Sequence, residues 1–287
     1  MKIGLFITGL KGELFLEMFD RDVEFVVTYK DGNVDDSSYD ATLEMCAERQ
    51  ISVIDRKDIV LETYETVDKI FVIGWQYMLN DCREKIIVLH DSYLPNLKGF
   101  CPTPTALIMG YPCMGATAFR PTDDVDEGPL YLKREIDVQY PIKLIEAINL
   151  VVKTYTEIVG DIIDNDIKCD KYNEDSVESY SIWRDEEDML IDWSSGAEDI
   201  RRFVDALSYP LGFSRSFYDG RIIKIEEVTP MPDMNFVDKK KHCGKIWNII
   251  DNKPLMLCGG VGMIRIDRAS ELTGEEIVFN KIRKRMK

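Results

Sequence analysis

Histidine is scarce in this sequence, and one histidine stands where proton chemistry is expected. His90 is the only histidine in the first 240 residues, and it directly follows the apolar run 85–89. The proline-containing stretch 91–99 comes next, and the acidic turn 123–128 supplies carboxylates further along. An imidazole has an ordinary pKa of about 6.5, so it can accept and return a proton near neutral pH. A carboxylate beside such a ring can orient it and stabilise its charged form.

The segments that must position this histidine alternate between two patterns. Short apolar runs occupy 1–9, 23–29, 51–54, 69–74 and 85–90, and amphipathic stretches such as 13–19 separate them. This alternation predicts an α/β fold with a doubly wound, mostly parallel sheet covered by helices. In such sheets ligands bind at the carboxyl ends of the strands. Gly9, Gly74 and His90 all fall at such ends, and we interpret Gly9 as a turn residue.

The middle of the chain predicts a hairpin followed by a long helix. Two alternating runs, 116–120 and 129–134, flank the acidic turn 123–128. Paired runs with a polar turn between them are typical of a hairpin. Pro141 then opens a long apolar-periodic stretch that ends at Ile163, which is the clearest helix pattern in the chain.

The last third of the chain predicts a small β module. Residues 164–188 are polar, acidic and without periodicity, as in a surface connection. A helix is expected over 197–207. Short strands bounded by glycines follow at 222–227, 244–250, 255–258 and 263–266. We therefore expect a catalytic domain over 1–188, and a linker helix with a small β-barrel-like domain over 189–287.

The charge of the chain is negative and uneven. Residues 238–287 contain 12 Lys and Arg against 6 Asp and Glu, while the other 237 residues contain 24 against 46. That larger part carries a formal charge of -22 and should repel polyanions. The composition therefore argues against a nucleic-acid partner.

Several other classes of protein are also disfavoured. The seven cysteines are dispersed, with no pair at CxxC spacing, which indicates reduced thiols and no disulfide frame or zinc site. Two histidines are too few for a His-rich metal cluster, and no metal site is expected. The apolar stretch 142–152 is interrupted by Lys143 and Glu146, whereas a membrane span needs roughly 20 apolar residues. We expect no leader peptide, no membrane partner and a cytoplasmic location.

The segments around His90 resemble a known family. The folate-dependent formyltransferases carry a His-x-Ser-Leu-Leu-Pro-x-x-Arg-Gly segment, then a Gly-x-Thr strand, then an Asp-x-Gly turn. The residues of this chain in those places are His90, Ser92, Leu94, Pro95, Gly99, Gly115, Thr117, Asp126 and Gly128. Tyr93 replaces the first leucine and Lys98 replaces the arginine. The pattern is closest to that of sugar N-formyltransferases, and the family also includes methionyl-tRNA formyltransferase.

The resemblance implies a site and a co-substrate. It implies a formyltransferase-type Rossmann-like domain that uses 10-formyltetrahydrofolate in one-carbon metabolism. His90 and Asp126 would be the catalytic residues, with His90 also touching the formyl oxygen and Asp126 governing its protonation. The cofactor-binding residues implied by the resemblance are Tyr77, Met78, Leu79 and Val125.

The chain departs from the family at one position that matters for chemistry. Relatives place an asparagine two residues before the histidine, where its amide steadies the formyl oxygen as it becomes anionic. This chain has Val88 there, and neither Asn80 nor Asn96 occupies the matching position. Loss of one such donor typically costs about a hundred- to a thousand-fold in rate.

Three functions remain open from the sequence. The first is N-formyl transfer to the amine of a nucleotide-activated amino sugar, because the acidity of the chain disfavours transfer RNA. The second is methionyl-tRNA formyl transfer. The third is a non-catalytic relative that binds folate or a nucleotide sugar and has lost the reaction, since fold alone does not establish activity. The oligomeric state is open, with a homodimer as one option.

Overall fold

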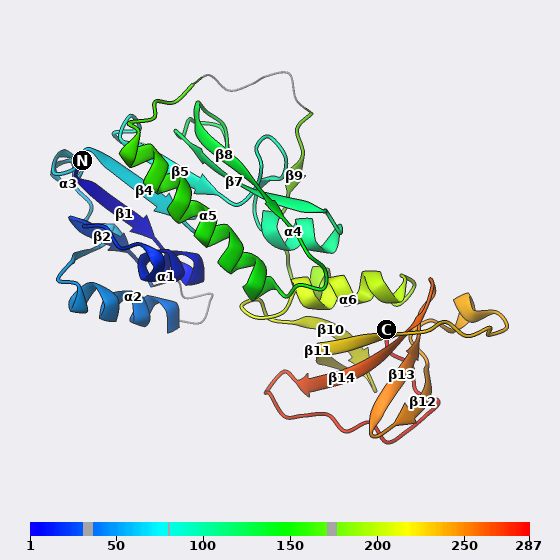
Figure 1. The fold of residues 1–287 in the computed structure, drawn as a ribbon. Helices are drawn as coiled ribbons and strands as arrows, with labels where there is room; N and C mark the ends of the chain where they lie inside the picture. Colours follow the sequence, from blue (N-terminus) through cyan, green and yellow to red (C-terminus); the bar gives the residue numbers. More distant parts are fainter. Residues whose placement is uncertain (31–36, 80, 171–176) are drawn as a thin grey trace. The chain divides into compact units, whose positions relative to one another are not determined.

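The chain forms two compact units in the computed structural model, which describes residues 1–30, 37–79, 81–170 and 177–287 (Figure 1). The first unit consists of Met1–Pro102, Cys113–Asp137 and Ile148–Ile182, and the second of Thr103–Pro112, Val138–Ala147 and Trp183–Lys287. Two short segments that precede residue 188 thus belong to the second unit. The predicted domain boundary between 188 and 189 stays a prediction.

The first unit is built on a seven-stranded sheet with the order β3-β2-β1-β4-β5-β7-β8. Its strands are β1 (Ile3–Ile7), β2 (Phe25–Thr28), β3 (Ser52–Asp55), β4 (Lys69–Ile73), β5 (Ile86–His90), β7 (Cys113–Phe119) and β8 (Leu130–Asp137). The first five are parallel to one another. The predicted doubly wound, mostly parallel sheet is therefore confirmed, as is the hairpin formed by β7 and β8.

Helices precede, separate or follow these strands along the chain. They are α1 (Gly9–Met18), α2 (Ser37–Glu48), α3 (Leu61–Glu65), α4 (Pro102–Ile108), α5 (Leu144–Asp164) and the short 3-10 helix η1 (Arg56–Asp58). The longest, α5, runs across one face of the sheet (Figure 1). Its buried residues Val151, Val152, Tyr155, Ile158, Val159 and Ile162 recur every three or four positions. That spacing places them on one face of the helix, which explains why this sequence forms an amphipathic helix against the sheet.

Strand β5 is the place where the sheet changes direction. On one side it pairs in parallel with β4, and Leu89 lies opposite Ile73. On the other side it pairs antiparallel with β7, and His90 lies opposite Thr117. His90 therefore has the end of a parallel strand on one side and the middle of an antiparallel strand on the other.

A second, two-stranded sheet lies close to the end of β5 in the sequence. Strand β6 (Lys98–Gly99) pairs in parallel with β9 (Tyr180–Ser181), which comes about 80 residues later. The sequence predicted an irregular connection over 164–188, and this prediction missed β9. Residues 171–176 of that connection lie outside the described part of the chain.

The second unit contains a five-stranded antiparallel sheet with the order β10-β11-β14-β13-β12. Its elements are η2 (Glu187–Met189), α6 (Ala197–Ala206), β10 (Ser214–Tyr218), β11 (Arg221–Met231), η3 (Lys239–His242), β12 (Ile246–Ile250), β13 (Lys253–Leu257) and β14 (Met263–Glu271). Ile200 and Val204 of α6 share a buried core with Ile223, Ile225 and Ile264 of the sheet. The predicted helix over 197–207 and the four predicted strands are confirmed, and β10 was missed.

Among the described residues, no helix combines the length and the apolar character that crossing a membrane would require.

Candidate active site

The structure brings His90 and Asp126 together. His90 is the last residue of β5 and is 7% exposed. Its Nδ1 atom lies 3.5 Å from Oδ2 of Asp126, which comes from the turn between β7 and β8. Two groups that lie far apart in the sequence thus meet at the carboxyl end of a central strand, as predicted from the resemblance.

The other nitrogen of the His90 ring contacts the backbone. Nε2 lies 3.0 Å from the carbonyl oxygen of Leu97. A carbonyl oxygen only accepts hydrogen bonds, so Nε2 carries the hydrogen and donates it. In the neutral ring Nδ1 then presents a lone pair to Asp126, whereas the protonated ring donates from both nitrogens. Nδ1 is therefore the ring nitrogen that faces the Asp126 carboxylate.

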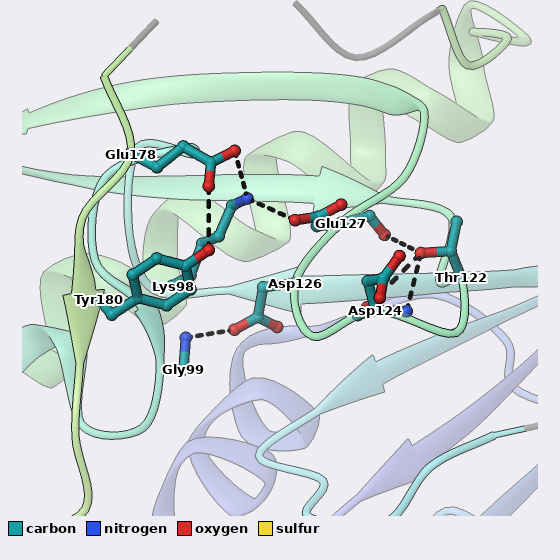
Figure 2. Close-up of polar contacts among 8 residues, drawn as sticks. All are labelled: Lys98, Gly99, Thr122, Asp124, Asp126, Glu127, Glu178 and Tyr180. Atoms are coloured by element: carbon teal, nitrogen blue, oxygen red, sulfur yellow. Dashed lines mark hydrogen bonds and ion pairs between the residues drawn. The ribbon is translucent and has the colours of Figure 1, made fainter. Parts of the chain in front are cut away.

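The backbone holds the Asp126 carboxylate in place. The Gly99 N–H donates to Oδ2 of Asp126 at 2.6 Å (Figure 2). The same oxygen is the one that lies 3.5 Å from Nδ1 of His90. Asp126 itself has a φ of +50°, and the base of its turn is closed by the Arg120 N–H, which donates to the Pro129 carbonyl at 2.9 Å. At Gly128, a Cβ atom would lie 2.0 Å from the Arg120 carbonyl oxygen, so only glycine fits.

Strand β7 supports the loop that follows His90. The Thr117 hydroxyl donates to the Ser92 carbonyl at 2.7 Å, and it accepts the Leu94 N–H at 3.2 Å. Gly115 allows the loop to approach the strand, because a Cβ atom there would lie only 2.3 Å from the Tyr93 nitrogen. These contacts explain physically why glycine and threonine occupy the two positions of the Gly-x-Thr strand.

Lys98 is a residue whose role the sequence did not reveal. Its side chain is fully buried, and Nζ lies 2.9 Å from Oε1 of Glu127 and 2.8 Å from Oε1 of Glu178 (Figure 2). The Tyr180 hydroxyl donates to Oε2 of Glu178 at 2.9 Å. The Lys98 ammonium, helped by Tyr180, holds the pKa of Glu178 below its ordinary value. Nothing in the sequence pointed to Glu178, which lies 80 residues from Lys98.

The residues expected to bind a cofactor expose apolar surface. Tyr77 is 47% exposed, Met78 55% and Val125 54%, while Leu79 packs against the core beside β4. The segment that contains Tyr77 follows β4, the strand next to β5, and Val125 directly precedes Asp126.

Aromatic rings surround the first part of this segment. The Tyr77 ring lies 5.2 Å from the Tyr29 ring and 6.3 Å from the Trp75 ring, measured between centroids. The Arg56 guanidinium lies over Tyr77, 3.9 Å from the centroid. The indole Nε1 of Trp75 is buried and has no hydrogen-bond partner in the described part of the chain. A flat, polar heteroaromatic ring is the kind of ligand that such surroundings suit.

Val88 occupies the position of the family asparagine and has only an apolar side chain to offer. It is half-buried, lies two residues before His90 on the same face of β5, and packs against the cluster that contains Val72 and Ile86. Asn96 is exposed in the loop after His90, and Asn80 lies outside the described residues. The structure thus provides no amide at this position of β5.

A buried tyrosine lies close enough to Asp91 and Asp126 to sense their charges. Tyr155 of α5 is 1% exposed, and its hydroxyl has no hydrogen-bond partner among the described residues. Burial raises the pKa of Tyr155 well above its usual range, and the carboxylates of Asp91 and Asp126 raise it further. Tyr155 therefore stays a neutral phenol. Asp91 in turn pairs with Lys11, whose Nζ lies 2.7 Å from Oδ1.

The comparisons with protein families match both parts of the chain. Residues 67–149 match the family described as formyl transferase, and this range contains His90 and Asp126. Residues 184–282 match the family described as formyl transferase, C-terminal domain.

Similar curated proteins are identical to this chain at about a quarter of the aligned residues. A methionyl-tRNA formyltransferase of Clostridium novyi (strain NT) is 27% identical over 190 residues, which are 63% of this chain and 58% of the relative. The bifunctional polymyxin resistance protein ArnA of Wigglesworthia glossinidia brevipalpis is 26% identical over 211 residues, 68% of this chain and 32% of the relative. The chain spans about half the length of the curated relatives it matches.

Similar solved structures cover nearly the whole chain. The sugar 3N-formyl transferase WlaRD, solved in the presence of dTDP and 5-N-formyl-THF, has a TM-score of 0.66 at 15% identity and covers 98% of this chain and 99% of its own. The N-formyltransferase of Helicobacter canadensis, in complex with folinic acid and dTDP-3-aminofucose, has a TM-score of 0.65 at 16% identity, with coverages of 96% and 100%. At this level of identity the likeness establishes the fold.

Proposed function

The chain belongs to the formyltransferase family, and we propose that it is a cytoplasmic enzyme that transfers a formyl group from 10-formyltetrahydrofolate to the amine of a nucleotide-activated amino sugar. The observation that carries the proposal is the contact between His90 and Asp126 at the carboxyl end of β5. It combines a proton acceptor with a fixed anion at the edge of the sheet where ligands of such folds bind.

The transfer requires movement of a proton. Bound 10-formyltetrahydrofolate would supply the formyl carbon. The incoming amine loses a proton as it forms the new bond, and the departing nitrogen must gain one. His90 takes the proton at Nδ1, since Nε2 already carries the hydrogen given to Leu97, and then gives it to the departing folate nitrogen, so that the ring returns to its neutral form. The Asp126 carboxylate stabilises the resulting charged ring, and the Gly99 N–H keeps that carboxylate in place.

The residues of the predicted folate site suit the pterin ring. Tyr77, Met78 and Val125 expose apolar side chains, and the indole N–H of Trp75 is a buried donor without a partner among the described residues. A pterin is flat and rich in hydrogen-bond acceptors. We assign Tyr77, Met78, Leu79 and Val125 to its binding, with Trp75 as an added donor.

Two observations favour a sugar amine as the acceptor. Outside residues 238–287 the chain carries a formal charge of -22, which opposes the binding of transfer RNA. The solved sugar N-formyltransferases also match this chain over nearly the whole length of both partners. The curated methionyl-tRNA formyltransferases match a smaller share of the chain. Because they are similar in sequence, transfer of a formyl group to methionyl-tRNA is the second candidate function.

The test is a transfer assay with the purified full chain. The protein is incubated with 10-formyltetrahydrofolate and a panel of nucleotide-linked amino sugars, and the products are weighed by mass spectrometry. A product heavier by one carbonyl unit supports the proposal. Formylated methionyl-tRNA, or a salt-dependent gel shift with transfer RNA, would support the second candidate instead. Binding of folate or a nucleotide sugar without any product would identify an inert relative.

A further inference from the structure

Lys98 lies between the two residues that touch the catalytic pair. The carbonyl of Leu97, directly before it, contacts Nε2 of His90, and the N–H of Gly99, directly after it, donates to Asp126. Any displacement of Lys98 therefore moves two contacts of the pair at once.

The Lys98 side chain links two distant segments of the chain to residues 97–99. Its ammonium pairs with Glu127, which directly follows Asp126 in the turn after β7. It also pairs with Glu178, which lies two residues before the start of β9 (Figure 2). A fully buried ammonium is costly unless carboxylates compensate it, so the pairing fixes the ammonium and both partners.

The backbone around β9 reinforces the same arrangement. The Lys98 N–H donates to the Ser179 carbonyl at 2.9 Å, and the Phe100 N–H donates to the Ser181 carbonyl at 2.9 Å. The Ser179 hydroxyl accepts the Leu97 N–H at 2.9 Å. Leu97, whose carbonyl orients His90, is thus held by β9 and its flanking residue. Gly99 requires this close approach, because a Cβ atom there would lie 2.5 Å from the Ser181 carbonyl oxygen.

We propose that Lys98, through its ion pairs with Glu127 and Glu178, is a positioning residue that holds His90 and Asp126 in the geometry for proton transfer. Residues 178–181 lie outside both segments that match the formyltransferase families, so this support comes from a part of the chain that the family match does not cover. The role in turnover rests on the proposed function, whereas the role in orienting the histidine ring does not.

The decisive variant is Lys98→Met, which keeps the buried length of the side chain and removes its charge. We expect kcat to fall about a hundred-fold with little change in KM, because a displacement of about 1 Å at a reacting group has an effect of that size. Lys98→Arg keeps a cation that can pair with both carboxylates and should retain kcat within about ten-fold. Lys153→Met, at an exposed lysine of α5 in the same unit, is the matched control and should behave as the unaltered protein.

A second readout does not depend on turnover. The chain has two histidines, so nitrogen-15 spectra resolve the ring nitrogens of His90 with His242 as an internal reference. In the unaltered protein the neutral His90 ring should carry its hydrogen on Nε2. Lys98→Met should give a mixture of the two tautomers, and Lys98→Arg should restore the single form.

The outcomes separate the two proposals. If no acceptor is formylated but the tautomer changes as expected, the proposed function fails and the positioning role stands. If Lys98→Met keeps kcat within about three-fold, or keeps the tautomer of the unaltered protein, the positioning role is wrong. Where Lys98→Met does not fold, Glu178→Gln is used, because it leaves the Lys98–Glu127 pair intact. It should lower kcat about ten-fold and broaden the His90 signals, and unchanged kcat and signals would overturn the proposal.

Discussion

The Nε2 atom of His90 lies 3.0 Å from the carbonyl oxygen of Leu97, and the backbone of Leu97 has a φ of +53°. This conformation costs a leucine on the order of 1 kcal/mol or more, because its Cβ crowds the neighbouring peptide. The carbonyl that sets the hydrogen position on His90 is therefore presented by a strained residue. The orientation of the ring depends on the whole loop after β5 and on the segments that hold it.

Replacement of His90 tests the proton acceptor. His90→Asn should lower kcat about a hundred- to ten-thousand-fold, the range usual for loss of a general acid or base. Binding of folate, measured by calorimetry, should change little. His242→Asn removes the other histidine of the chain and serves as the control. Full turnover of His90→Asn at saturating substrate concentrations would show that another group moves the proton.

Replacement of Asp126 separates charge from position. In Asp126→Asn the side-chain oxygen can still accept the Gly99 N–H, so the turn should keep its shape while the negative charge disappears. We expect kcat to fall about a hundred-fold or more, because the charged His90 ring loses its counterion. Asp124→Asn, at an exposed aspartate of the same turn, is the control. Equal rates for the two variants would contradict the role of Asp126.

Val88→Asn tests whether the missing amide limits the reaction. The new side chain would lie on the face of β5 that also bears His90, two residues away. If a donor to the formyl oxygen is what the chain lacks, kcat should rise about ten-fold or more. The melting temperature should drop, since the amide enters a largely apolar cluster. A stable variant without any gain in kcat would mean that another group already supplies the donor.

Gly115→Ala tests the support of the loop by β7. The new Cβ would lie 2.3 Å from the Tyr93 nitrogen, so the loop must move. We expect a loss of about 1–3 kcal/mol in the free energy of unfolding, typical of overpacking, together with a loss of kcat. Gly160→Ala is the matched control, because its Cβ in α5 would meet only a side-chain nitrogen of Arg21 at 3.7 Å. Alanine favours helix there and should stabilise the protein slightly. The free energy of unfolding of both variants is measured by denaturant titration. Equal stability of the two variants would contradict the role of Gly115.

Asp205 predicts a pH dependence of stability in the second unit. Burial raises the pKa of Asp205 to about 6, above its ordinary 3.8. The folded state thus binds a proton more tightly than the unfolded state, so stability falls as the pH rises from below 4 through 6. Asp205→Asn should raise the melting temperature at pH 8, by the equivalent of about 1 kcal/mol after allowance for solvent screening, and leave it unchanged near pH 4. An equal effect at both pH values would contradict this cause.

The sequence predicted the elements whose patterns are local. The runs that became β1, β2, β4 and β5 are apolar because both faces of the sheet are covered, and the periodicity of α5 followed from its single buried face. The position of His90 at a strand end was predictable for the same reason. Its meeting with Asp126 was predictable only through the resemblance to a family.

Contacts between distant segments left no such signal. Glu178 and Tyr180 lie in a polar, acidic stretch that indicated a surface connection, and the buried ammonium of Lys98 is what makes them structural. The two-residue strands β6 and β9 are too short to show an alternation. Lys98 itself was noted only as a substitute for the family arginine, because burial of a lysine depends on partners that the sequence does not place.

The closed base of the turn that carries Asp126 has a consequence for how activity can be gained or lost. The hydrogen bond from the Arg120 N–H to the Pro129 carbonyl closes the base of the turn 121–128. The length of this turn can therefore change while β7 and β8 stay paired. A one-residue deletion within this turn would move the Asp126 carboxylate away from the His90 ring, and β7 and β8 would stay paired. A change in the length of this turn can therefore lower or abolish turnover without altering the fold. Proteins that share this fold need not share the same rate of turnover.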